Sequence, residues 1–192
     1  MKKYFPIVIF IMGFTGFLCG QVAFDLFAQA KKEKLVHPKI IKKYERIFSK
    51  TTFETISGDK IRLKEIAAPI VMLNFWASWC TPCLEEFPSI VDLRQKFKKD
   101  EIFIIGVNSD EENHLKEIKK VSRKYKFNFP NVADPSGGIL SEFDVTSIPL
   151  TIIFYQGKVL EVMKGPHDFS SVEIGNNFNK LIEKSRAVVR TN

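Results

Sequence analysis

The chain has 192 residues, of which 45% are hydrophobic and 27% are charged. These fractions are those of an ordinary globular protein, and they exclude an intrinsically disordered chain, a collagen-like repeat and a polytopic membrane protein. Three cysteines are too few for a disulfide-stapled scaffold, and with three histidines they are too few to suggest a zinc module.

The net charge of +7 is concentrated in one short stretch of the chain. Residues 31–50 carry eight basic and two acidic side chains, whereas residues 51–192 carry 19 of each. A nucleic-acid-binding protein needs cationic groups spread over a folded face. We therefore expect no nucleic-acid partner.

The N-terminal residues 1–30 have the features of an export signal. Tyr4–Phe24 is a run of 21 residues without a charged side chain, and roughly 20 apolar residues can span a bilayer as a helix. Ala28-Gln29-Ala30 has the small residues that signal peptidase reads. We expect a location in the periplasm or on the extracytoplasmic face of the membrane, with the chain anchored by residues 4–24 or released after Ala30. Because positive charge tends to stay in the cytoplasm, the basic residues 31–50 leave a cytoplasmic domain as the alternative.

Residues 31–50 read as a basic amphipathic linker. Between Pro38 and Ser49, apolar side chains recur at helical spacing, with lysines on the opposite side. Such a helix could lie on anionic lipid headgroups. Alternatively, its apolar stripe packs on the domain that follows, and the pattern leaves both interpretations open.

The first elements of that domain alternate between strand and helix signals. Thr51–Ile56 and Lys60–Leu63 predict a short strand pair around a Ser57-Gly58-Asp59 turn. Ile70–Trp76 is a nearly continuous apolar run, as expected for a strand that is covered on both faces. A helix should follow from Pro82 to Lys98, with a kink at Pro88.

The second half of the chain continues the alternation. We expect a strand at Ile102–Val107, a helix at Glu111–Tyr125 with Leu115 and Ile118 on its apolar side, a short helix at Gly138–Phe143, a hairpin of Leu150–Phe154 and Val159–Met163, and a helix at Ser170–Lys184. This order predicts an α/β fold with a central mixed sheet flanked by helices and an N-terminal β-hairpin extension. The predicted domain covers residues 51–186, and residues 187–192 form a tail.

The sequence Trp79-Cys80-Thr81-Pro82-Cys83 lies between the buried strand and the helix that follows it. Cys80 would stand at the helix N-terminus, where unpaired N–H groups and the helix dipole favour a thiolate. Cys83, one turn later on the same face, is near enough to close a disulfide. The pair can therefore cycle between dithiol and disulfide: Cys80 attacks, and Cys83 resolves the mixed disulfide.

Two other interpretations of this pair are weaker. A zinc site would need two further Cys or His ligands, and His37, His114 and His167 show no ligand spacing. An inert structural disulfide over two intervening residues would constrain the unfolded chain little.

These motifs together resemble the thioredoxin superfamily, and within it the TlpA/ResA-like thiol–disulfide oxidoreductases, which are membrane-anchored or exported. The resemblance covers roughly residues 51–186. It is carried by Leu73–Cys83, Glu86-Phe87-Pro88, Val107-Asn108-Ser109-Asp110, Phe129-Pro130 with Asp134, and Ser147-Ile148-Pro149. It implies a thioredoxin-like fold.

The resemblance also implies roles for residues outside the cysteine pair. Pro149 matches the family's cis-proline, and Ile148 would offer its backbone to an extended substrate segment. Trp79 would shield the cysteines and contact partners, whereas Trp76 belongs to the core. The expected substrate-binding residues are Trp79, Thr81, Pro82, Ile148 and Pro149.

Glu86 matches the family's active-site glutamate in the pattern Cys-x-x-Glu-x-Pro. A partly buried carboxyl group one helical turn beyond Cys83 could have a raised pKa and exchange protons with Cys83. The alternative is an exposed helix carboxylate, the role expected for Glu85. Asn74 stands where thioredoxin has a buried aspartate, and Asp134 reads as a loop or cap residue.

The predicted function is a thiol–disulfide oxidoreductase that reduces selected protein disulfides outside the cytoplasmic membrane, for example in cytochrome c maturation. It would need no cofactor besides the Cys80–Cys83 pair. Expected partners are a disulfide-bearing protein such as apocytochrome c, an upstream membrane thiol reductant, and the membrane through the N-terminal segment.

Two rival functions remain. A peroxiredoxin-like peroxidase would require Pro-x-x-x-Thr/Ser-x-x-Cys, which the residues before Cys80 do not provide. A copper-delivery module would use Cys-x-x-x-Cys with a downstream histidine, for which His167 is the candidate.

Overall fold

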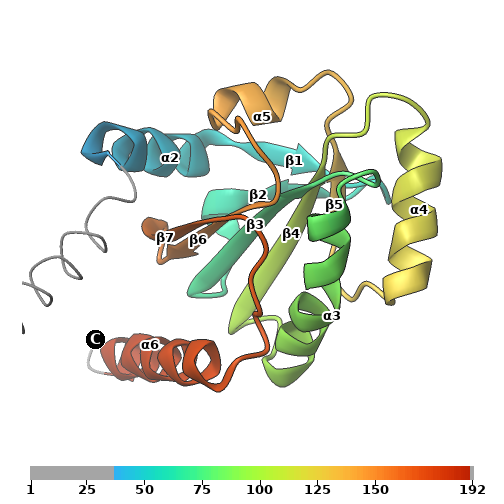
Figure 1. Ribbon diagram of the computed structural model, residues 1–192. Coiled ribbons are helices and arrows are strands. Elements are labelled where there is room, and N and C mark those ends of the chain that lie inside the picture. The colour runs from blue at the N-terminus through green and yellow to red at the C-terminus, as the bar shows by residue number, and fades with distance from the viewer. Residues whose placement is uncertain (1–36, 191–192) are drawn as a thin grey trace, which may run out of the picture. The chain divides into compact units, whose positions relative to one another are not determined.

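The computed structural model describes residues 37–190, and the compact unit that contains the fold begins at Lys39. Helices and strands alternate along it (Figure 1). They are α2 Pro38–Lys50, β1 Thr52–Glu54, β2 Lys60–Arg62, a 3-10 turn Leu63–Glu65, β3 Ile70–Trp76, α3 Thr81–Lys96, β4 Ile102–Asn108, α4 His114–Tyr125, β5 Asn131–Ala133, α5 Gly138–Glu142, β6 Leu150–Tyr155, β7 Lys158–Lys164 and α6 Val172–Arg190.

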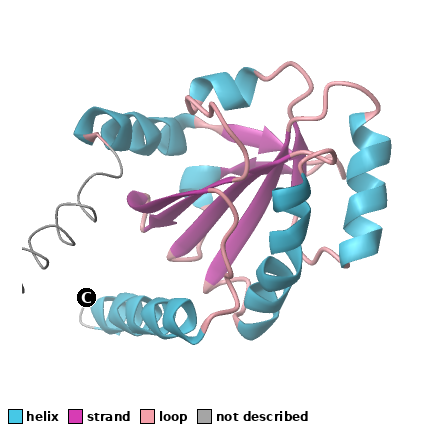
Figure 2. Ribbon diagram, in the orientation of Figure 1, coloured by secondary structure: helices cyan, strands magenta, loops and turns pink. Residues whose placement is uncertain are grey.

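A five-stranded mixed sheet forms the centre of this unit, in the order β5-β4-β3-β6-β7. β4 runs parallel to β3 and to β5, whereas β6 is antiparallel to β3 and to β7. β1 and β2 form a separate antiparallel pair. Figure 2 shows the strands fanned between helices on both sides. The predicted fold class, a mixed sheet flanked by helices with an N-terminal hairpin, is therefore confirmed.

Every residue of β3 is buried, as the continuous apolar run predicts. Successive side chains of a strand point to opposite faces. Met72 and Trp76 therefore point to the face that α3 covers, where Trp76 meets Phe87 edge to face at 5.0 Å between ring centroids. Phe75 points the other way and contacts Phe143, which follows α5. Asn74 is the polar exception on the α3 face, and it is fully buried.

Helix α2 packs its apolar stripe on the domain. Tyr44, Ile47 and Phe48 are buried, the Tyr44 ring contacts Phe143, and the Phe48 ring lies 4.6 Å from that of Phe154 in β6. Of the two interpretations of this amphipathic segment, the structure thus supports packing on the domain.

The sequence did not predict β5, which is the edge strand beside β4. It has only three residues, it follows Pro130, and it begins with the polar Asn131, so it is too short for an alternating pattern to show. Tertiary contacts place it: Trp76 Nε1 donates to Asn131 Oδ1 at 3.2 Å, and Gly106 N donates to Pro130 O at 3.0 Å.

Two helix starts were predicted too early. α4 begins at His114 instead of Glu111, because the left-handed Asn113 (φ 51°) precedes it. Leu115, expected on the apolar side, is 47% exposed, whereas Ile118 is buried. α6 begins at Val172 instead of Ser170, because the Asp168 carboxylate accepts from the backbone N and hydroxyl of Ser170 and so forms a turn before the helix.

The predicted membrane segment, residues 4–24, and the cleavage site after Ala30 lie outside the described residues. Between residues 37 and 190, none of the helices has both the length and the apolar character needed to cross a bilayer.

Candidate active site

The cysteine pair lies where the sequence predicted, between the end of β3 and the first turn of α3. Cys80 is the N-cap of α3, and its Sγ accepts a hydrogen bond from Cys83 N at 3.3 Å. The two residues form a disulfide with an S–S distance of 2.04 Å and a Cα–Cα distance of 5.3 Å. Both are buried, Cys80 at 5% exposure and Cys83 at 0%. The structure therefore describes the oxidised state of the pair.

The residues around the disulfide differ sharply in exposure. Trp79 is 71% exposed although it is adjacent to Cys80, and Thr81 and Pro82 are exposed as well. A large aromatic ring is thus exposed to solvent next to a buried disulfide.

Pro149 comes to the same end of the sheet from β6. Leu150 pairs with Phe75 in the antiparallel β3–β6 ladder, so Pro149 lies level with the end of β3 from which the Cys80 loop departs. The Ile148–Pro149 peptide bond is cis, which confirms the predicted conformation. Pro149 is buried and Ile148 is half-buried.

Glu86 is a buried carboxyl group and not an exposed helix carboxylate. It is 2% exposed, one helical turn after Cys83 in α3. Its Oε1 accepts from Asn74 Nδ2 at 2.6 Å, and its Oε2 accepts from the backbone N of His167 at 3.3 Å. Burial raises the pKa of Glu86 to about 7, and the hydrogen bonds from Asn74 and His167 only partly oppose that rise. Near neutral pH this group can therefore hold or release a proton.

Asn74 connects the carboxyl group to the sheet. Besides donating to Glu86, its Nδ2 donates to Thr151 Oγ1 of β6 at 3.0 Å. The buried Oδ1 of Asn74 accepts no hydrogen bond from any of the described residues. Thr151 had no role in the sequence analysis, and its only signal there was a hydroxyl in an otherwise apolar strand.

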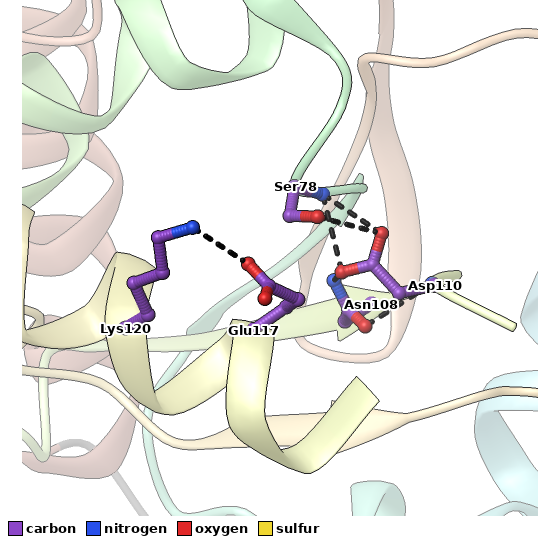
Figure 3. Close-up of polar contacts among 5 residues, drawn as sticks. All are labelled: Ser78, Asn108, Asp110, Glu117 and Lys120. Atoms are coloured by element: carbon purple, nitrogen blue, oxygen red, sulfur yellow. Dashed lines mark hydrogen bonds and ion pairs between the residues drawn. The ribbon is translucent and has the colours of Figure 1, made fainter. Parts of the chain in front are cut away.

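A second buried polar cluster holds the loop before Cys80 and was missed by sequence reasoning (Figure 3). The carboxylate of Asp110, 3% exposed, accepts from Ser78 N at 3.0 and 3.2 Å, from Ser78 Oγ at 3.1 Å and from Asn108 Nδ2 at 2.9 Å. Asn108 ends β4, so the cluster ties that strand to the residue before Trp79. The available signal was the polar Asn108-Ser109-Asp110 directly after a buried apolar strand.

Two further predictions concern residues near the site. Trp76 is fully buried and belongs to the core, as predicted. Asp134 acts as a cap: its Oδ2 accepts from Leu140 N at 2.9 Å in the first turn of α5.

His167, considered above as a candidate metal partner, supplies a backbone donor to Glu86. It belongs to the segment 165–170 between β7 and α6, and its ring Nε2 lies 3.3 Å from Lys164 O.

One hollow lies at the other end of the sheet, away from these residues. It has a volume of about 810 Å³ and is lined by Pro69, Glu101 and Gln156 among others. These residues border the opposite ends of β3, β4 and β6, so that hollow includes no predicted site residue.

The sequence matches one known family and a group of thiol–disulfide oxidoreductases. The sequence profile of the AhpC/TSA family matches residues 46–163. Thiol-disulfide oxidoreductase ResA of Bacillus thuringiensis subsp. konkukian is 32% identical over 179 residues, which cover 90% of this chain and 95% of the relative. ResA of Bacillus subtilis is 34% identical over 133 residues, covering 69% of this chain and 73% of the relative.

Solved structures agree on the fold. StoA from Bacillus subtilis superposes with a TM-score of 0.56 at 24% identity, covering 67% of this chain and 95% of StoA. A putative thiol:disulfide interchange protein DsbE from Chlorobium tepidum superposes with a TM-score of 0.60 at 23% identity, covering 69% and 92%. The resemblance to thioredoxin-like proteins is thus confirmed.

Proposed function

This chain belongs to the AhpC/TSA family and is a thiol–disulfide oxidoreductase related to ResA, and we propose that it reduces selected protein disulfides outside the cytoplasmic membrane. The observation that carries the proposal is a Cys80–Cys83 disulfide at the N-terminus of α3 beside a buried Glu86 and an exposed Trp79. Such a dithiol needs no bound cofactor, because the two cysteines carry the electrons.

The proposed reaction exchanges one disulfide for another. The Cys80 thiolate, favoured by its N-cap position, attacks one sulfur of the substrate disulfide, and the other substrate sulfur leaves as a thiolate that takes a proton from solvent. Cys83 then gives its proton to the Glu86 carboxylate and attacks Cys80, which releases the second substrate thiolate. The substrate gains two electrons, and the enzyme is left with the disulfide described above.

The exposed residues around the pair suggest how a substrate would bind. Trp79, Thr81 and Pro82 present a surface to the partner, and the backbone of Ile148 next to Pro149 would pair with an extended segment. We propose that the substrate is a disulfide in an apocytochrome c and that its reduced cysteine pair is the product of the reaction. The electrons would return to Cys80–Cys83 from a membrane thiol reductant, and residues 4–24 would anchor the chain or be removed after Ala30.

Cysteine variants test the mechanism directly. Cys80→Ser should abolish reduction of a disulfide-bearing protein, because the attacking thiolate is gone. Cys83→Ser should accumulate a mixed disulfide that mass spectrometry detects. Retained turnover in Cys80→Ser would contradict the assignment, and Cys19→Ser serves as the matched control that should leave turnover unchanged.

The direction of electron flow is tested by the equilibrium reduction potential of the pair. Reference values run from about −270 mV for thioredoxin to about −120 mV for a strong periplasmic oxidant. A value near or below the thioredoxin end supports a reductase. A value near the oxidising end would assign disulfide formation instead and refute the proposed direction.

Peroxide consumption is the control assay for the peroxidase alternative. We expect the protein to consume no more peroxide than the Cys80→Ser variant does, because the residues before Cys80 lack the peroxidatic pattern. Copper titration of the reduced protein tests the metal-delivery alternative, for which we expect no stoichiometric binding that depends on His167.

A further inference from the structure

A hollow reaches Glu86 from the surface between α3 and the segment that follows β7. Its volume is about 470 Å³, and its lining includes Glu86 and Ser89 from α3 together with His167 and Asp168 from the segment 165–170. None of Trp79, Cys80 and Cys83 lines it. Glu86 therefore follows Cys83 by one turn of α3 and also lines a hollow that the cysteines do not reach.

Hydrogen bonds hold the wall of the hollow in place. Ser89 Oγ accepts from Phe169 N at 3.0 Å and donates to the carbonyl of Glu86 at 2.8 Å. Lys96 Nζ donates to Ser170 O at 2.9 Å, farther along the same segment. The segment is thus fastened to α3 at Phe169 and Ser170, just after His167, whose backbone N–H donates to Glu86.

Acidic side chains from both walls line the hollow. Glu85 and Asp92 come from α3, and Asp168 comes from the opposite wall with the His167 imidazole beside it. Hydrogen bonds from the side chain and the backbone of Ser170 lower the pKa of Asp168, and Lys96 adds to that effect. A rim of carboxylates attracts protons and cationic proton carriers.

We propose that Glu86 exchanges its proton with solvent through this hollow, so that the carboxyl group can release a proton while a substrate protein covers Trp79 and Cys80. The inference rests on the proposed role of Glu86 as the acceptor of the Cys83 proton. In each cycle the Cys83 thiol transfers one proton to the carboxylate, and that proton leaves to water or buffer in the hollow before the next cycle. No electrons move in this step.

The test is buffer catalysis of the resolving step in the full chain. Reduced protein is mixed with a synthetic peptide that contains one disulfide, and the rate of mixed-disulfide resolution is followed at increasing imidazole concentration, at constant ionic strength and at a fixed pH below 7. Below pH 7 Glu86 starts with a proton, which it must release before it can accept the proton of Cys83. The hollow therefore predicts that the rate rises with imidazole, because the buffer removes that first proton.

Three variants locate the route. Asp92→Trp narrows the hollow and should remove the dependence on imidazole, whereas Gln95→Trp, an exposed position on the same helix that does not line the hollow, should keep it. His167→Ala widens the hollow without removing the backbone donor and should steepen the dependence. Because the two hollow variants act in opposite directions, a folding defect cannot produce both results.

Glu86→Gln separates this proposal from the one on which it rests. If this variant loses both the pH dependence and the imidazole dependence while Asp92→Trp keeps them, Glu86 accepts the proton but the hollow is not its route. If Glu86→Gln keeps the pH dependence of the unaltered protein, the role of Glu86 itself is wrong. A dependence in His167→Ala no steeper than in the unaltered protein also overturns the route.

Discussion

Two buried carboxyl groups have different surroundings: Glu86 lies in α3 one turn after Cys83, and Asp110 lies in the loop after β4 and contacts Ser78, two residues before Cys80. Asp110 accepts four contacts from Ser78 and Asn108. Glu86 accepts two hydrogen bonds, one of them at 3.3 Å, and borders an open hollow. Burial at a redox site therefore does not by itself define the role of a carboxyl group.

The two carboxyl groups differ in the number of donors that they face. Hydrogen bonds to the charged form oppose the cost of burying a charge. With many donors, Asp110 fixes the backbone before Trp79. With few, Glu86 keeps its proton to near neutral pH, as its raised pKa of about 7 shows. The predictions below test this division, beginning with the largest effect.

Removing the anchor should cause the largest loss of stability. Asp110→Ala leaves the half-buried Ser78 N–H and the buried Asn108 amide without this acceptor, and we expect the free energy of unfolding to fall by about 3 kcal/mol. Asp110→Asn keeps one acceptor oxygen and should lose less. Chemical denaturation of the oxidised protein measures both, and equal losses in the two variants would contradict the anchoring role.

Glu86→Gln should change how stability depends on pH. The folded pKa of about 7 lies above the ordinary value of 4.5, so between these pH values the folded state binds more protons at this group than the unfolded state does. The free energy of unfolding therefore falls as the pH rises from 4.5 to 7. Above pH 7 this group causes no further fall. The total amounts to about 3 kcal/mol. Relative to the unaltered protein, Glu86→Gln should therefore gain stability between pH 5 and pH 8.

The matched control for that experiment is Glu85→Gln, which changes the exposed neighbour in the same helix. Its stability curve should stay parallel to that of the unaltered protein from pH 5 to pH 8. If the Glu86→Gln curve is parallel as well, Glu86 does not titrate in this window and the comparison with Asp110 fails.

Asn74→Ala should make Glu86 still less acidic. It removes the shorter of the two hydrogen bonds to the carboxyl group, so we expect the titration midpoint of Glu86 to rise by roughly one pH unit. Thr151→Val removes the other acceptor of the Asn74 amide without touching Glu86 and should shift the midpoint less. NMR titration of the side-chain carboxyl carbon gives both values, and an unchanged midpoint in Asn74→Ala would be evidence against this contact.

The smallest effect should come from Ser89→Ala. It removes the acceptor of Phe169 N, and we expect a loss of about 1 kcal/mol together with faster hydrogen exchange at that amide. Ser49→Ala is the control, since the Ser49 hydroxyl donates to Arg46 O on an exposed helix surface and should contribute almost nothing. Equal losses would mean that Ser89 does not hold the segment 165–170.

The sequence alone determined the fold class and the reactive pair. The nearly continuous apolar run Ile70–Trp76 predicted a strand covered on both faces, because a solvent-facing side would place a polar residue at every second position. The position of Cys80 before a helix followed from the strand–helix order and from Pro82 in the first turn. Pro149 in cis followed from the resemblance, since its own neighbours do not require it.

The tertiary structure alone decided the surroundings of the carboxyl groups. The donor to Glu86 from His167 is a backbone N–H that lies 81 residues away, and every residue except proline carries such a group, so no side-chain pattern marks it. Ser78 and Asp110 are 32 residues apart and meet because β3 and β4 are parallel neighbours. Sequence can place a carboxyl group on a helix, but whether it anchors a loop or holds a proton depends on donors that only the folded chain brings together.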